Sequence, residues 1–149
     1  MERRVRSKVA LFSLILLVVV AVTYAYCLLS SVTRISSVGI VKAVGVGVYW
    51  DVNCRSTVTQ IDWGLLDPGG TANVTVYLKN VGNAPLTLSL NTENWDPLNV
   101  SDYITLQWDY QGESVNPGQV REVVLVLSVS STITGITDFR FDIIIIGSG

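Results

Sequence analysis

The sequence predicts an all-β fold, a single immunoglobulin-like or jelly-roll β-sandwich of about seven strands preceded by one N-terminal hydrophobic helix. Apolar and polar residues alternate along successive short segments, and Gly, Pro, Asn and Asp gather between these segments, in the predicted turns 67–70, 80–85, 94–99 and 116–118. No helical pattern lies between the turns, and this rhythm is typical of a sandwich. The expected strands are 44–50, 57–63, 72–79, 85–91, 103–110, 119–129 and 138–146.

The N-terminus has a basic flank and a long uncharged apolar run. Four basic side chains in residues 3–8 precede residues 9–29, about the roughly 20 residues that a helix needs to cross a bilayer. The basic flank should stay cytoplasmic, so the remaining chain should be extracellular or lie at the cell surface. Two alternatives stay open for this segment: a transmembrane anchor, or a signal peptide cleaved after Ala25, where Thr23 and Ala25 give a small-x-small pattern.

The predicted organisation therefore has three parts. Residues 1–29 are the basic flank with the signal or transmembrane segment, residues 30–43 are a linker or donor segment, and residues 44–149 are the sandwich domain. The N-terminal segment should contact a membrane at least before processing. Slightly more than 100 residues beyond it suffice for one core.

Composition argues against several classes of function. From Tyr26 onward, six basic side chains face eleven acidic ones, so we expect no nucleic-acid partner. Histidine is absent from the chain, which removes the commonest general base and zinc ligand. Together with the absence of a phosphate-binding glycine loop or nucleophile elbow, this predicts a protein that is not an enzyme and needs no cofactor or metal.

The first expected strand carries the main functional hypothesis. Its even positions are apolar and would form one face, while two glycines would allow close approach of another backbone. Such a strand could be donated to a neighbouring subunit, with the near-continuous apolar strands 121–129 and 139–146 as acceptors. It could equally be the first strand of its own domain. The candidate residues for donation are Val44, Gly45, Val46, Gly47, Val48 and Trp50.

Other side chains suggest surface features. The sequons at Asn73 and Asn99 are candidate glycosylation sites, with Asn73 on the polar side of its strand. Trp108 shares the apolar side of its strand and should be inside, whereas Trp63 and Trp95 adjoin turns and are the better candidates for exposure. Five aspartates near turns and strand ends are expected to be solvated: Asp62, Asp67, Asp96, Asp102 and Asp109.

The two cysteines do not make a disulfide framework. Cys27 would lie near the outer edge of an uncut leader, and Cys54 belongs to the domain. Cleavage after Ala25 would let Cys27 pair with Cys54 of the same or another subunit. The other interpretation is two unpaired thiols.

The order of a basic leader, an apolar run, a glycine-containing strand, "IDWGLLDPGGTANVTVYLKNVGNAPLTLSL", "NWDP" and a late Pro-Gly turn resembles archaeal exported β-sandwich proteins of the surface or of filaments. It also resembles the TasA/camelysin-type fibre subunits and the archaeal bundling pili related to them, over most of residues 38–147. The resemblance implies that the leader is removed and that each sandwich is completed by an N-terminal strand from the next subunit. It thus implies a homopolymer.

Two further hypotheses belong to other classes. An uncut leader would give a membrane-anchored extracellular immunoglobulin-like domain that binds a protein or glycan partner. A type IV pilin-like subunit would also have a basic leader and an apolar helix, but the expected processing site is missing at "RSKVAL", and the apolar run stops at "SSVTRISS".

Overall fold

The computed structural model describes Leu17 and residues 34–149. The chain divides into two compact units, Met1–Val32 and Thr33–Gly149, and the second unit is the β domain. Apart from Leu17, the predicted signal or membrane segment at 9–29 lies outside the described residues, and so does Cys27. In the part of the chain that is described, no helix has the length and apolarity needed to span a bilayer.

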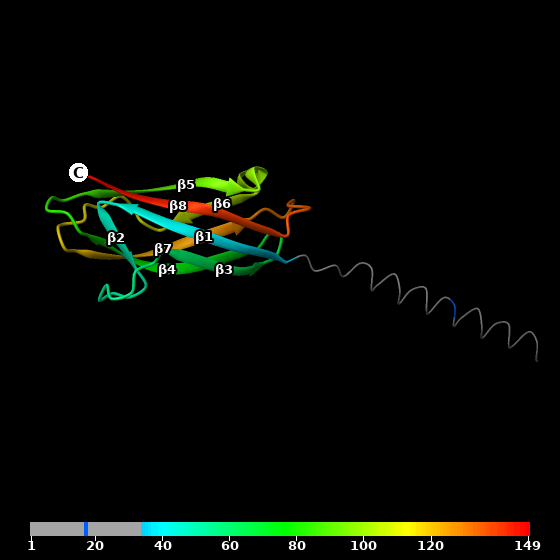
Figure 1. Cartoon of the computed structure of the whole chain (residues 1–149), viewed down its shortest axis with the longest axis horizontal. Helices are drawn as coiled ribbons and strands as arrows, with labels where there is room; N and C mark the ends of the chain where they lie inside the picture. Colours follow the sequence, from blue (N-terminus) through cyan, green and yellow to red (C-terminus); the bar gives the residue numbers. More distant parts are fainter. Residues whose placement is uncertain (1–16, 18–33) are drawn as a thin grey trace, which may run out of the picture. The chain divides into compact units, whose positions relative to one another are not determined.

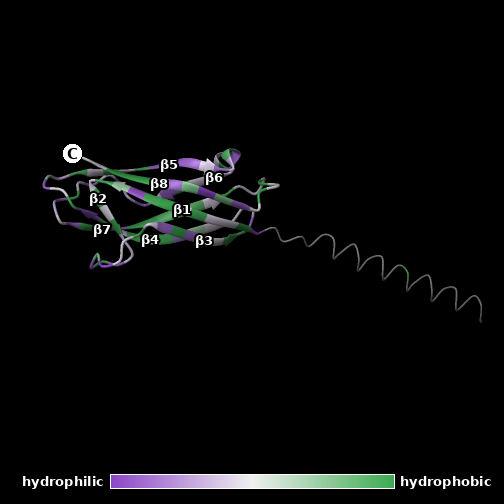
Figure 2. Ribbon diagram, viewed as in Figure 1, coloured by the Kyte–Doolittle hydropathy of each residue, from purple (hydrophilic) through white to green (hydrophobic). Residues whose placement is uncertain are grey.

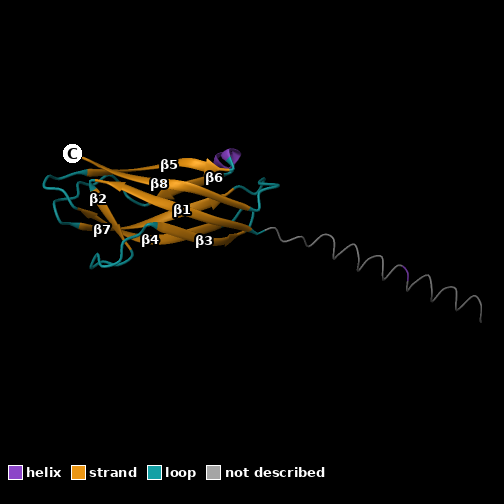
Figure 3. Ribbon diagram, in the orientation of Figure 1, coloured by secondary structure: helices purple, strands orange, loops and turns teal. Residues whose placement is uncertain are grey.

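The domain is built from strands with one short 3-10 helix (Figure 1 and Figure 3). In chain order the elements are β1 (Ile35–Val44), β2 (Val46–Tyr49), β3 (Gln60–Leu66), β4 (Thr71–Asn80), β5 (Thr87–Asp96), η1 (Leu98–Asp102), β6 (Ile104–Trp108), β7 (Val120–Val129) and β8 (Asp138–Ser148).

The strands form two four-stranded sheets. Sheet A has the order β3-β1-β8-β5, and sheet B has the order β2-β4-β7-β6. Every neighbouring pair is antiparallel except β1 and β8, which run parallel. Inward residues of both sheets share one apolar core. The prediction of an all-β fold is therefore confirmed.

The core arises from the alternation of side chains along each strand. In β7, Val123, Leu125 and Leu127 are buried, and between them lie half-buried residues on the opposite face. From sheet A, Phe141 and Ile143 of β8 point into the same core. Burial of one such side chain stabilises the fold by about 1.5–3 kcal/mol.

Asn80 at the end of β4 is a buried polar residue with all of its side-chain groups in use. Its amide donates to the carbonyl oxygens of Ala84 and Val115, and its side-chain oxygen accepts the Gly82 backbone N–H. These bonds hold the predicted turn at 80–85 against the loop before β7. The cost of burying the amide is offset because each group is bonded.

The near-continuous apolar run of β8 fits its place between β1 and β5 inside sheet A, where apolar residues lie on both of its faces. Ile143 and Ile145 are fully buried in the core, while Ile144 and Ile146 are half-buried on the outer surface of the sheet. Figure 2 shows the hydrophobic colour along β1 and along the C-terminal part of its neighbour β8. The outer surface of sheet A is therefore apolar near the C-terminal end of β8.

The structure differs from the expected strand list at its beginning. The predicted single strand 44–50 is interrupted at Gly45, and the segment expected as a linker or donor, 30–43, contains most of β1. The expected strand 57–63 begins later, as β3. The later strands lie close to their predicted positions, and the predicted turns at 67–70 and 116–118 connect β3 to β4 and precede β7.

Replacement of Gly39 in β1 should destabilise the domain. A Cβ at this position would lie 2.8 Å from Ile143 Cδ1 and 3.1 Å from Trp63 Nε1, and both of these side chains are buried and cannot move aside easily. We expect Gly39→Val to lower the free energy of unfolding by about 1–3 kcal/mol in urea titrations, since overpacking strains the surrounding core. Ser36→Val, on the exposed side of the same strand, should change it by no more than about 0.5 kcal/mol. Equal midpoints for the two variants would contradict this packing.

Candidate functional site: the β1 slot

The first strand of the domain occupies the interior of sheet A. β1 pairs with β3 on one side, from Ile35 opposite Leu66 to Ile40 opposite Gln60, and with β8 along the other side. Without β1, the edges of β3 and β8 would face each other with unpaired N–H and C=O groups. We call this space between β3 and β8 the β1 slot. Only an extended chain can satisfy both of its edges.

The inward side of β1 is made mostly of small residues. Ile35 and Ser37 are buried, Val41 packs partly against the core, and Gly39 and Ala43 add little volume. Only Ile35 among them places a large side chain fully inside the core. Main-chain hydrogen bonds to β3 and β8 therefore hold β1 in the sheet more than burial of its side chains does.

Trp63 reaches the inner side of the slot because β3 contains a bulge. The register between β1 and β3 shifts after Ser37, where Gly64 has a φ of 72° and its N–H bonds to Asp62 Oδ1. Trp63 is only 5 % exposed. The prediction that Trp63 is exposed is therefore wrong, because the bulge turns it toward the core.

The outer side of the slot carries a polar cluster that spans three strands. Lys42 Nζ of β1 donates to Asp142 Oδ2 of β8, and Asn94 Nδ2 of β5 donates to the same oxygen at 2.7 Å. The Asp142 side chain is 9 % exposed, against 53 % for Lys42. Asn94 reaches this oxygen from a left-handed backbone conformation, with a φ of 54°.

These two donors change the acidity of the carboxyl group. The hydrogen bond from Lys42 and then that from Asn94 hold the pKa of Asp142 below its ordinary value of 3.8, against the opposing effect of burial. Asp142 is therefore an anion beside a cation from β1 at neutral pH.

A single residue connects β1 to the rest of the domain. Gly45 has a φ of 72° and carries the chain from β1 in sheet A to β2 in sheet B. This conformation interrupts the strand alternation and favours glycine. Because β1 is the first strand and Gly45 its only connection, rotation at one residue could separate β1 from its own slot.

The candidate donor residues are consequently divided between two environments. Val46 and Val48 are buried in the core through β2, whereas Val44 and Trp50 are 61 % and 40 % exposed. The expectation that all four share one face is wrong because of the turn at Gly45. Gly47 leaves space for the ring of Tyr49, which a Cβ would approach to 2.6 Å. An aspartate at position 46 would accordingly disrupt the core.

The two strands expected to accept a donor also differ. β8 is the parallel neighbour of β1, from Ser36 opposite Asp138 to Val44 opposite Ile146. β7 lies in sheet B between β4 and β6, and it does not pair with β1. Sequence reasoning missed β3 as the second neighbour of the slot, and it missed Ile35, Gly39 and Lys42 as the residues that fit β1 into it.

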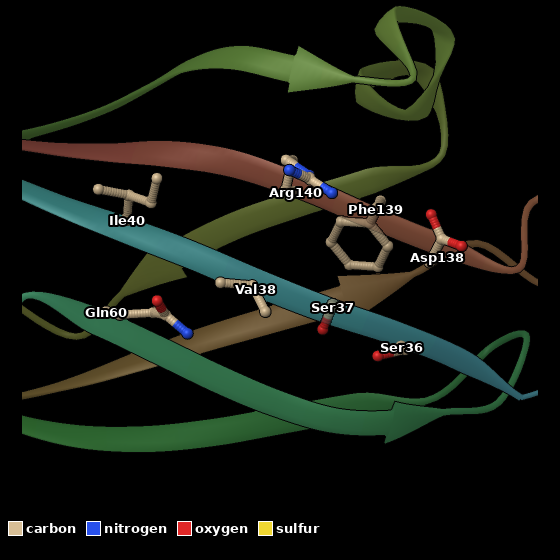
Figure 4. A pocket seen from close by; sticks show the side chains of 8 residues that line it. All are labelled: Ser36, Ser37, Val38, Ile40, Gln60, Asp138, Phe139 and Arg140. Atoms are coloured by element: carbon tan, nitrogen blue, oxygen red, sulfur yellow. The ribbon is translucent and has the colours of Figure 1, made fainter.

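A surface groove of about 450 Å³ lies over β1 and its two neighbours. Figure 4 shows Val38 and Ile40 of β1 between Gln60 of β3 and Arg140 of β8. Since β1 supplies Ser36, Ser37, Val38 and Ile40 to its lining, this groove depends on the strand that fills the slot.

The other aromatic expectations have mixed outcomes. Trp95 is half-buried and stacks on Phe141 with ring centroids 4.2 Å apart. Trp108 lies on the apolar side of β6 with Ile104 and Leu106, as predicted. It packs against the core and is half-buried. The exposed tryptophan is Trp50, next to exposed Val52 in the loop between β2 and β3.

The remaining polar candidates lie on the surface of the described domain. Asn73 is exposed on β4 and Asn99 is exposed in η1, so a glycan could be accommodated at either residue. Cys54 is a half-buried thiol outside any disulfide with a described residue. The five aspartates singled out from the sequence are all exposed, and no group of three or more Cys, Asp or Glu side chains is arranged to hold a metal within residues 34–149.

Comparison of the chain with protein-family models and with curated protein sequences gave no match.

The link between Asp142 and β1 predicts a specific response to acid. A carboxylate whose pKa is lower in the folded protein stabilises the fold at pH values above its unfolded pKa, and this contribution is lost as the pH falls through the folded pKa. We therefore expect the free energy of unfolding to decline below about pH 4. Asp142→Asn should be less stable than the wild type at pH 7 and should show a shallower decline, in urea titrations from pH 7 to pH 3.

Lys42→Gln tests whether Lys42 causes the low pKa of Asp142, because this variant removes the strongest donor and leaves the carboxyl group in place. It should also reduce the dependence on pH. Parallel pH curves for the wild type and Asp142→Asn would rule out this coupling.

Proposed function

We propose that this protein is a structural subunit of an extracellular filament or surface layer, and that its subunits assemble by donating β1 to the β1 slot of a neighbour. The observation that carries the proposal is the position of β1: the first strand of the domain, in the interior of a sheet, joined to the domain by Gly45 alone. The resemblance to exported fibre subunits points in the same direction.

Exchange of β1 would preserve nearly all contacts of the closed domain. The donated strand would meet β3 and β8 of the neighbour in the same register, and only the conformation at Gly45 would change. Swapping of an identical element between subunits is a low-cost route to assembly, and very short connections favour it. The closed single chain is thus the monomeric form in this proposal.

The geometry of exchange favours a chain of subunits. Each subunit has one donor strand and one slot, which are different surfaces, so the contact is head-to-tail. A head-to-tail contact that does not close into a ring generates a fibre. Assembly is therefore a homopolymer that needs no cofactor.

The finer fold assignment belongs to the same proposal. Two sheets of four strands give the eight strands of a jelly roll, one more than the constant-type immunoglobulin domain. We propose a jelly-roll-related sandwich whose first strand is exchangeable.

A membrane-anchored domain that binds a protein or glycan is the second candidate. The exposed side chains of Trp50 and Val52 in the loop between β2 and β3 favour it, because they offer an apolar contact outside the core. In that case β1 would remain in its own slot.

The state of the N-terminus separates these two candidates. Cleavage after Ala25 would release the N-terminal side of β1 from the bilayer, so the filament proposal predicts native protein that begins at Tyr26. The intact mass of protein taken from cells measures this start, and the same spectrum shows glycans on Asn73 or Asn99. A start at Met1 would favour the anchored domain.

Cross-linking between chains tests the exchange itself. Val38 of β1 and Arg140 of β8 are register partners on the outer surface of sheet A, at a separation suited to a disulfide. We expect a mixture of Val38→Cys chains and Arg140→Cys chains, both lacking Cys27 and Cys54, to form disulfide-linked dimers on oxidation. Non-reducing electrophoresis measures these dimers.

The matched control pairs Val38→Cys chains with Ser89→Cys chains. Ser89 lies on β5 opposite Ile146 and is separated from β1 by β8, so it should give only background cross-linking. A Val38 and Arg140 mixture that stays at this background, while a chain carrying both cysteines forms an internal disulfide, would exclude exchange.

A further inference from the structure

The polar cluster on the outer side of the slot could determine which strand the slot accepts in the proposed assembly. Lys42 is the residue that β1 contributes to this cluster. Asp142 lies on β8, which borders the slot, and Asn94 lies on β5, the next strand of the sheet. We propose that the contact between Lys42 and Asp142 selects which strand the slot accepts and, together with Gly39, fixes its register, so that the accepted partner is a second copy of this chain. This inference rests on the proposed function.

The inward side of β1 cannot select the partner strand alone, and its alternation does not fix the register. A shift by two residues keeps every side chain on its original face, so the alternation of inward and outward residues does not oppose it. The small inward residues Ser37, Gly39 and Ala43 fill little space. Gly39 does oppose a shift, because any Cβ at its place would meet Trp63 and Ile143, but it does not distinguish this strand from other strands that carry glycine at that position.

Asp142 supplies the missing selection. Its direct partners in the sheet are Ile40 on β1 and Glu93 on β5, and Lys42 is opposite the next outward residue of β8, Ile144. Direct partners share a face, so Glu93 adds a second negative charge beside Asp142. A strand without a cation at this position would leave a mostly buried carboxylate with Asn94 as its only donor.

A shift of two residues toward the C-terminal end of β8 would have the same effect as a wrong strand, because Lys42 would then lie opposite Ile146, away from Asp142. A shift in the other direction is opposed by Gly39, because Val41 would take its place and bring a Cβ to 2.8 Å from Ile143 Cδ1. The slot therefore requires a small residue on the inward side, as at Gly39, and a lysine three residues later on the outward side. An odd spacing of three places these two residues on opposite faces of a strand.

Charge exchange in mixed chains tests this selection in the full-length protein. Lys42→Glu places a carboxylate against Asp142, and Asp142→Lys places two lysines together, so each variant alone should sediment as polymer at least tenfold less than the wild type. An equimolar mixture should recover assembly, because each strand then finds an oppositely charged slot only on the other variant. One chain with both substitutions should also assemble.

The wild type and the cysteine mixtures distinguish this inference from the proposed function. Absence of cross-links between Val38→Cys chains and Arg140→Cys chains that keep Lys42 and Asp142 would reject strand exchange and the selection with it. Cross-linked polymer of normal yield from either single variant would reject only the selection by charge. If the doubly substituted chain assembles and the mixture of the two single variants does not, the contact acts within one chain. That result would overturn the inference.

A neutral variant guards against loss of folding. Asp142→Asn keeps the size of the side chain, and circular dichroism checks that it folds. Its slot should accept the strand of Lys42→Glu chains as readily as the wild-type strand. Lys42→Glu chains that carry Val38→Cys should therefore cross-link to Arg140→Cys chains that carry Asp142→Asn, and not to Arg140→Cys chains that keep Asp142. Exclusion of Lys42→Glu chains by the Asp142→Asn slot would contradict the role of Asp142.

Discussion

An interior strand must pair its main chain on both sides, and β1 meets this requirement with β3 and β8. The surrounding structure depends on this pairing. The small inward residues let the strand lie flat against the core, the bulge at Gly64 moves Trp63 beneath it, and Lys42 adds a charged contact on the outer side. Without β1, sheet A has two unsatisfied edges in its middle.

The two sheets contribute to this arrangement in different ways. β4 and β7 pair over nine consecutive positions in sheet B and bury alternate large side chains, so they supply much of the apolar core. β1 adds one large buried side chain, Ile35, and a long run of main-chain pairing. Main-chain pairing is the same for a strand of the same chain and one from another. The proposed exchange of β1 would therefore leave most of the core burial unchanged.

The sequence analysis predicted the later strands well because β4, β7 and β8 place large apolar residues at every second position. It missed β1 because Ser37 and Gly39 occupy inward positions that are usually apolar, so the alternation is hidden. The positive φ of Gly45 divides the expected strand 44–50, and no pattern of residue types indicates such a turn unambiguously. The contact between Lys42 and Asp142 joins residues 100 positions apart, and only the sheet order brings them together.

The parallel alignment of β1 and β8 has a mechanical consequence. The chain enters β1 at the end where β8 begins, and it leaves β8 at the opposite end, so residue 34 and the C-terminus lie at opposite ends of the sandwich (Figure 1). Tension between these two points pulls β1 lengthwise against β8. All hydrogen bonds between the two strands then bear the load together, instead of opening one after another. The same shear geometry applies whichever chain supplies β1.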